Sequence, residues 1–317
     1  MFILKPMLCA LAVAGVCIPA QATTRIAVSF DDPGALYGRY YADIERTTVA
    51  AGSEWLSHFA LVAPGAELSV RVGFASIATA NGRSASSAFV WTDGDGVGVF
   101  EQGAAHELRT GIDINGESAD IEFNLGIDGY LQDELWFDPD PAARLASVPA
   151  DRTDAVSVML HEFGHALGFN GWRHGLSGDL AGNYQSTFDA WVRPYETANG
   201  TVLQFHGAAA LLHHGAPVPL TYGNYAHLGN LGSASGADLV PDLMNGIVFY
   251  RGTRYDISAL DLRILHDIGL PVTLAVPEPG TFALWLAGLG LLAAARRGSR
   301  RPTAGVRPRS DGADSPL

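Results

Sequence analysis

The sequence has very little cysteine and lysine. Among its 317 residues there are two cysteines, Cys9 and Cys17, and one lysine, Lys5. Residues 1–22 begin with a short basic segment that contains Lys5, continue with an apolar run and end in small residues. This pattern predicts a secretory signal peptide that signal peptidase cleaves after Ala22. The exported chain would then have no cysteine, which excludes disulfides, thiol nucleophiles and thiolate metal ligands.

Basic residues are also scarce in the rest of the chain. Residues 23–276 carry 13 Arg and no Lys against 30 Asp and Glu, a formal charge of −17. An acidic, lysine-free domain repels phosphate backbones, so we expect no nucleic-acid partner. With 48% hydrophobic and 17% charged residues, the chain is expected to be globular, with a single domain of about 250 residues.

The apolar run near the C-terminus, residues 281–295, is shorter than the about 20 residues that a permanent membrane span needs. It follows Pro277-Glu278-Pro279 and precedes four arginines. This combination resembles a PEP-CTERM sorting signal, which we place at residues 276–301, before a polar tail at 302–317. The resemblance implies a bacterial protein that an exosortase-type enzyme processes and that resides at the cell surface or in the extracellular matrix. The short apolar segment would act as a transmembrane helix with transient membrane contact; a permanent anchor is the alternative.

Hydrophobic periodicity predicts an α+β (mixed α/β) domain over residues 23–275. Expected strands are residues 25–30, 68–75, 88–92 and 119–124, and expected helices are 40–59, 153–167 and 257–268. We divide this domain into an N-terminal subdomain, 23–169, and a largely irregular and helical C-terminal subdomain, 170–275.

Residues 161–169, HEFGHALGF, carry the strongest chemical signal. His161 and His165 are one helical turn apart, so both imidazoles can bind one Zn²⁺, and Glu162 can take a proton from water that the metal activates. Thr153 or Asp154 can cap the helix, and Gly168 can end it. Because this helix is apolar almost all round, two histidines and a glutamate would be costly there without partners, which favours zinc binding over a structural helix.

A catalytic zinc needs a third protein ligand and an open position. The pattern HExxHxxG resembles the metzincin clan of zinc peptidases, but Gly171 stands where the clan has its third histidine. Residues 242–246, Asp-Leu-Met-Asn-Gly, resemble the Met-turn, and the whole layout resembles the leishmanolysin-like branch, whose third histidine is distant. On that resemblance His227 becomes the third ligand, and His174 is the next choice. The downstream histidines are His174, His206, His213, His214 and His227.

Two other clans take the third ligand from a carboxylate. A gluzincin would use a downstream glutamate, for which Glu196 is the candidate. An aspzincin would use the aspartate of GTxxD, and residues 252–256 read Gly-Thr-Arg-Tyr-Asp. We interpret that segment as the approach to the last helix.

The metzincin resemblance implies a twisted sheet with an active-site helix and one catalytic Zn²⁺. It also implies an exported metalloendopeptidase that cleaves protein or peptide substrates with Glu162 as general base. Residues 119–124 would be the edge strand that receives the substrate. The alternative is a non-catalytic surface or matrix protein with a vestigial zincin fold, suggested by the missing histidine at Gly171.

Two acidic segments have calcium-like spacing. Residues 93–96 read Asp-Gly-Asp-Gly and residues 113–117 read Asp-Ile-Asn-Gly-Glu, but neither segment has the glutamate at the twelfth position that completes an EF-hand loop. We interpret both as hairpin turns and keep Ca²⁺ as a second candidate metal.

Overall fold

The computed structural model describes residues 25–197, 200–229, 239–247, 249–274 and 288–289. The chain divides into two compact units, residues 1–274 and 275–317, and nearly all described residues belong to the first. The expected signal peptide, most of the sorting segment and the polar tail lie outside the described residues.

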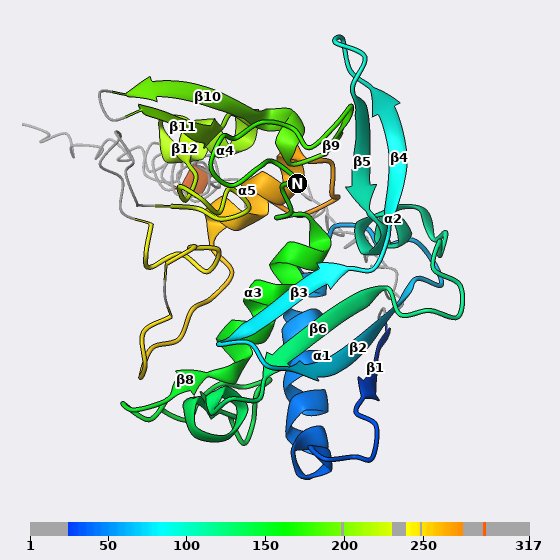
Figure 1. The fold of residues 1–317 in the computed structure, drawn as a ribbon, viewed down its shortest axis with the longest axis vertical. Helices are drawn as coiled ribbons and strands as arrows, with labels where there is room; N and C mark the ends of the chain where they lie inside the picture. The colour runs from blue at the N-terminus through cyan, green and yellow to red at the C-terminus, as the bar shows by residue number, and fades with distance from the viewer. Residues whose placement is uncertain (1–24, 198–199, 230–238, 248, 275–287, 290–317) are drawn as a thin grey trace, which may run out of the picture. The chain divides into compact units, whose positions relative to one another are not determined.

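The first unit mixes α-helices with several small sheets (Figure 1), which confirms the mixed α/β class. The strands are β1 (Arg25–Asp31), β2 (Glu67–Ala75), β3 (Ala80–Ser84), β4 (Ser87–Thr92), β5 (Gly98–Gln102), β6 (Ile121–Gly126), β7 (Leu135–Trp136), β8 (Thr153–Asp154), β9 (Tyr184–Ser186), β10 (Val192–Thr197), β11 (Gly200–Phe205) and β12 (Val218–Pro219). The α-helices are α1 (Tyr41–Ser57), α2 (Gly103–Thr110), α3 (Ala155–Leu167), α4 (Ala208–His214) and α5 (Ala259–Asp267). Short 3-10 or π turns are Gly38–Tyr40, Tyr130–Glu134 and Asp189–Trp191.

The sheet nearest the site has the strand order β1-β2-β6-β3. Its first three strands are parallel, and β3 runs antiparallel to β6 at the edge. On β2, Leu68, Val70 and Val72 are buried and alternate with more exposed residues, as expected for a strand that covers a core on one face. Helix α1 packs on β1, and α3 packs on both α1 and β3 (Figure 1).

Helix α3 is buried between α1 and the sheet. Trp55 of α1 donates its indole N–H to the Leu160 carbonyl at 2.8 Å, and Phe123 of β6 meets Phe163 edge-on at 5.0 Å between ring centroids. A Cβ at Gly52 would lie 2.8 Å from the Phe163 ring, so glycine allows α1 to approach this closely. The apolar composition of α3 thus follows from contacts on several sides.

The ends of α3 agree with the predicted caps. Asp154 is the N-cap, and its side chain accepts the N–H of Ser157 at 3.2 Å. At the other end, a Cβ on Gly168 would lie 2.2 Å from Ile268, just after α5. Gly168 therefore ends the helix where only a glycine lets α5 pack against it.

The predicted strands and helices are all present within a few residues, but the chain from residue 170 to 226 is not largely irregular. It contains β9, α4 and the sheet β10-β11-β12. The interpretation was wrong because β10 has mostly exposed side chains and β11 is buried without alternation from Val202 to Phe205, so neither shows the two-residue period of a half-buried strand.

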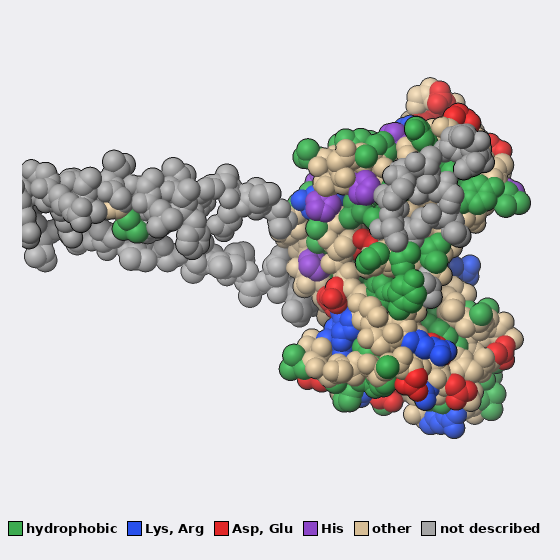
Figure 2. Space-filling view, turned by 90° about the vertical axis from the view of Figure 1, so that its left-hand side faces the viewer, with side chains coloured by type: hydrophobic (Ala, Val, Ile, Leu, Met, Phe, Trp, Pro, Cys, Tyr) green, Lys and Arg blue, Asp and Glu red, His purple; other side chains and the backbone are tan. Residues whose placement is uncertain are grey.

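Acidic and basic side chains are interspersed on the face of the first unit shown in Figure 2. Several of the scarce arginines are in ion pairs: Arg71 and Arg83 both contact Glu122, and Arg254 contacts Asp138 at 2.6 Å. Among the described residues, no helix has the length and apolar character to cross a bilayer. The segment 281–295, where a short membrane helix is expected, lies almost entirely outside the described residues.

Candidate metal centre

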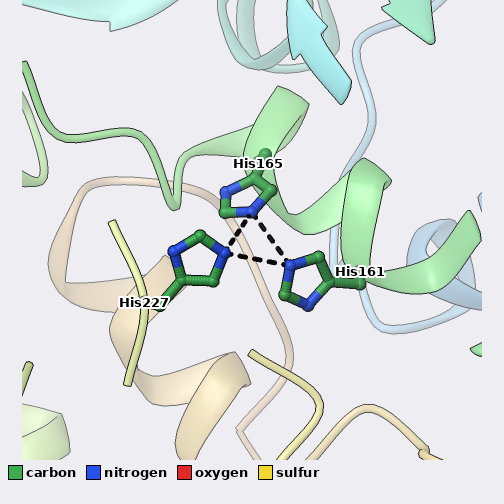
Figure 3. A group of neighbouring side chains, drawn as sticks. All are labelled: His161, His165 and His227. Carbon is green, nitrogen blue, oxygen red and sulfur yellow. Dashed lines mark hydrogen bonds between the residues drawn. The ribbon is translucent and has the colours of Figure 1, made fainter. Parts of the chain in front are cut away.

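Three histidine side chains converge on one point (Figure 3). His161 and His165 come from successive turns of α3, and His227 comes from the loop that follows β12. The Nε2 atoms lie 3.0 Å apart in His161 and His165, 3.1 Å in His161 and His227, and 2.9 Å in His165 and His227. The structure therefore brings together the three residues that the sequence had proposed as ligands.

Backbone carbonyls orient two of the three rings. Nδ1 of His161 lies 2.7 Å from the Leu243 carbonyl oxygen, and Nδ1 of His165 lies 2.5 Å from that of Phe169. Because a carbonyl oxygen can only accept, each Nδ1 must carry the proton and each Nε2 of a neutral ring presents a lone pair. This is the arrangement in which a second interaction fixes a metal-binding imidazole.

Burial favours the neutral form of the three rings. Burial lowers the pKa of His161 to about 3, and it also lowers the pKa of His165 and of His227, with repulsion from the neighbouring imidazoles contributing for His161 and His227. The Nε2 atoms of His161 and His165 are thus two acceptors that face each other with no proton between them. Such a contact is unfavourable unless a cation lies at the centre.

The donor set suits a zinc ion. Zn–N bonds of 2.0–2.1 Å at tetrahedral angles separate the ligand nitrogens by about 3.3 Å. The observed separations of 2.9 to 3.1 Å are a few tenths of an ångström shorter. Three neutral imidazoles with one side open to a cleft match the composition of a catalytic zinc site.

The loop 242–246 underlies the histidines. Met244 is fully buried, and a Cβ on Gly164 would lie 2.5 Å from its sulfur, so the glycine inside the HEFGH sequence makes room for the methionine. The Met244 carbonyl accepts the N–H of Leu228 at 2.8 Å, and Leu228 O accepts the N–H of Gly246 at 3.2 Å. These bonds tie the loop to the segment that carries His227.

Glu162 lies beside the histidines and is 5% exposed. Burial raises the pKa of its carboxyl to about 8, and a hydrogen bond from the Gly82 N–H opposes this shift. A Cβ on Gly82 would be 2.6 Å from the Glu162 Cβ, so β3 lies directly against the helix at this residue. The position of the Glu162 carboxyl is therefore fixed relative to β3.

A cleft of about 770 Å³ opens at the histidines. The stretch from Thr79 to Ser87, which includes β3, lines one side, while Trp172, Asn224 and Phe249 are among the residues elsewhere in its wall. β3, the edge strand of the main sheet as the described residues form it, thus borders the candidate centre.

This arrangement corrects the expected substrate strand. The predicted residues 119–124 correspond to β6, which pairs with β2 on one side and with β3 on the other. An interior strand has no free backbone groups for a peptide, whereas β3 pairs with β6 alone among the strands that the structure describes. The sequence missed β3 because Ala-Asn-Gly-Arg-Ser has no hydrophobic alternation.

Tyr130, like β3, is a part of the cleft that the sequence did not predict. It belongs to the π turn after β6 and lines the cleft. Burial, followed by the nearby charges of Glu162 and Glu134, strongly raises the pKa of its hydroxyl, which stays protonated. No motif in the sequence marks this position.

The rival third ligands lie elsewhere. Glu196 on β10 is exposed and accepts a hydrogen bond from Thr201 at 2.9 Å. Asp256 pairs with Arg144 at 2.5 Å, and His174 is exposed and contacts Ser177 at 3.3 Å. None of the three belongs to the imidazole cluster.

The comparisons with known proteins concern the C-terminus. The family model for the PEP-CTERM protein-sorting motif matches residues 275–301. The chain carries a PEP-CTERM sorting signal. This confirms the prediction made for residues 276–301 and implies export with surface or extracellular sorting, and exosortase-type enzymes recognise such a motif. No match was found among curated proteins or solved structures, so the metzincin-like fold stays a prediction.

Proposed function

We propose that the chain is an exported, zinc-dependent metalloendopeptidase. The observation that carries the proposal is the convergence of three neutral imidazole nitrogens beside the buried Glu162 carboxyl, at the floor of a cleft bordered by a free strand edge. The donor set supports zinc, the carboxyl supports general-base chemistry, and the strand edge supports an extended peptide as substrate.

The residues of the site would have separate roles in hydrolysis. His161, His165 and His227 would hold the metal. A bound Zn²⁺ supplies Lewis-acid chemistry that activates water and polarises the scissile carbonyl. Glu162 takes the proton of the attacking water and delivers it to the leaving nitrogen.

The substrate would lie along β3. An extended peptide can pair its backbone with the free edge of this strand, and the contact between Gly82 and Glu162 would keep the scissile bond in register with the base. The protonated hydroxyl of Tyr130 is available in the same cleft to donate a hydrogen bond to the developing oxyanion.

The non-catalytic alternative rested on the glycine at position 171. That position lies next to Asp189, whose carboxyl accepts the N–H of Trp172 at 2.8 Å. His227 occupies the third corner of the cluster instead, so the missing histidine no longer argues for a vestigial site.

We expect the chain from residue 23 onward to cleave casein into fragments. The metal chelator 1,10-phenanthroline should abolish cleavage, and added Zn²⁺ should restore it, whereas a serine-directed inhibitor should change nothing. Fragments are measured by gel electrophoresis and their termini by mass spectrometry. Absence of cleavage of any peptide bond by a folded, zinc-loaded chain would contradict the proposal.

A further inference from the structure

Three carboxyl groups come together away from the cleft. Glu107 belongs to α2, Asp113 to the loop after it, and Asp120 immediately precedes β6. One oxygen of each lies within 4.8 Å of the others. The loop is not the hairpin turn that we expected, because it joins a helix to a strand. It is folded by Asp113, whose Oδ1 accepts the N–H groups of Asn115 and Gly116 at 2.6 and 2.9 Å.

Two of these carboxyl groups are buried. Glu107 is 5% exposed and Asp120 is 3% exposed, whereas Asp113 is exposed. Burying neighbouring carboxylates is unfavourable unless a cation or a proton compensates their charge.

Asp120 has its hydrogen bonds satisfied. Its Oδ2 accepts the N–H and the hydroxyl of Ser69 at 2.8 and 2.7 Å, and its Oδ1 accepts the side-chain amide of Asn115 at 3.0 Å. Its Oδ1 accepts a single hydrogen bond and keeps a lone pair for a cation.

Glu107 has one oxygen without a partner. Its Oε1 accepts the N–H of Glu67 at 3.1 Å, but the buried Oε2 has no hydrogen-bond partner among the described residues. Burial and the facing charges of Asp120 and Asp113 raise the pKa of Glu107 to about 7. An unpaired, buried carboxyl oxygen that faces two other carboxyl groups is an acceptor available to a cation.

We propose that Glu107, Asp113 and Asp120 bind one Ca²⁺. The donors are all carboxylate oxygens, which suit the hard cation Ca²⁺ better than zinc, and three carboxylates exceed the one or two with which Mg²⁺ is usually held. Water can complete the shell on the side of the exposed Asp113. Extracellular calcium modules bind Ca²⁺ with dissociation constants of about 10⁻⁴ to 10⁻³ M, and the sorting motif implies that this chain is exported.

The site would join three parts of the fold. Glu107 on α2 accepts the N–H of Glu67, and Asp120, just before β6, accepts the N–H of Ser69. Both donors belong to β2. A bound cation would therefore fasten α2 and its loop to the main sheet. The expected consequence is higher stability, and the cluster does not line the histidine cleft.

The test measures calcium binding by titration calorimetry and the midpoint of thermal unfolding of the zinc-loaded chain. We expect Ca²⁺ at about 10 mM to raise the midpoint by several degrees, and Mg²⁺ at the same concentration to have little effect. Asp113→Asn should weaken binding by about tenfold or more without unfolding the chain, since its side chain is exposed. Glu107→Gln should raise the midpoint in calcium-free buffer and remove the calcium response.

Asp95→Asn is the matched control. Asp95 lies in the turn between β4 and β5, the other segment with calcium-like spacing, and it is exposed. This variant should keep the wild-type response. Two results would overturn the proposal: no binding heat and no rise for the wild type, or an equal rise in wild type and Asp113→Asn.

Discussion

We expect Glu162→Gln to lower the rate of casein cleavage by about 10²- to 10⁴-fold and to leave one zinc per chain. The amide has the size of the carboxyl and can still accept the Gly82 N–H, but it cannot accept the proton of the attacking water. Because Glu162 is not among the converging imidazoles, the metal should stay. Cleavage rate, zinc content and the circular dichroism spectrum are measured on the same sample.

Glu196→Gln is the control for this experiment. Glu196 is the glutamate that a gluzincin would use as a ligand, and here it is exposed on β10. Its replacement should change neither cleavage nor zinc content. Full activity in Glu162→Gln would show that the general base has been assigned wrongly.

We expect His227→Ala to lose zinc and, with it, casein cleavage. Removing one of three imidazoles leaves two protein ligands, and we expect affinity to fall by more than about 100-fold, since changes in the outer shell alone cost 10- to 100-fold. The fold should survive, because the backbone of Leu228, not the His227 side chain, holds this segment to Met244. Zinc affinity is measured by competition with a chromogenic chelator.

His174→Ala distinguishes the two third-ligand hypotheses. This histidine is exposed and hydrogen-bonds with Ser177, so its loss should leave zinc affinity unchanged. If His174→Ala released the metal and His227→Ala retained it, the arrangement of imidazoles described above could not be the binding site.

The sequence predicted the helix that carries the site because the signal is local. The apolar stripe, the cap at Asp154 and the glycine at its end all lie within residues 154–168, and they produce α3 as expected. The spacing of His161 and His165 follows from one helical turn. Their mutual geometry could therefore be expected without knowledge of the rest of the fold.

The position of His227 could not be derived in that way. It lies 62 residues beyond His165, and its place depends on the bonds between Leu228 and the loop that contains Met244. The five downstream histidines offered no spacing rule that distinguishes them. A resemblance to the Met-turn pointed to His227, and the structure places that imidazole beside the other two.

The edge strand shows a second limit. Whether a strand lies inside a sheet or at its edge depends on which strands pair, and pairing is non-local. The hydrophobic alternation of residues 119–124 correctly indicated a strand, β6, but it could not indicate that β3 covers its outer edge. The short, polar β3 packs against α3 at Gly82. Hydrophobic periodicity cannot predict such a contact.

The acidic cluster illustrates the same point. The loop 113–117 suggested calcium by its spacing, but its partners are Glu107, on the helix before the loop, and Asp120, just before the strand that follows it. The EF-hand pattern places its ligands within one loop. The absence of that pattern therefore says nothing about a cluster whose ligands come from different elements.

The most direct test of the account is the zinc content of the purified wild-type chain from residue 23 onward, measured by elemental mass spectrometry. Three imidazoles whose Nε2 atoms converge within 3.1 Å favour a bound cation, and we predict one zinc per folded chain. A folded chain that is free of zinc after expression with zinc in the medium would contradict the metal centre and the peptidase assignment together.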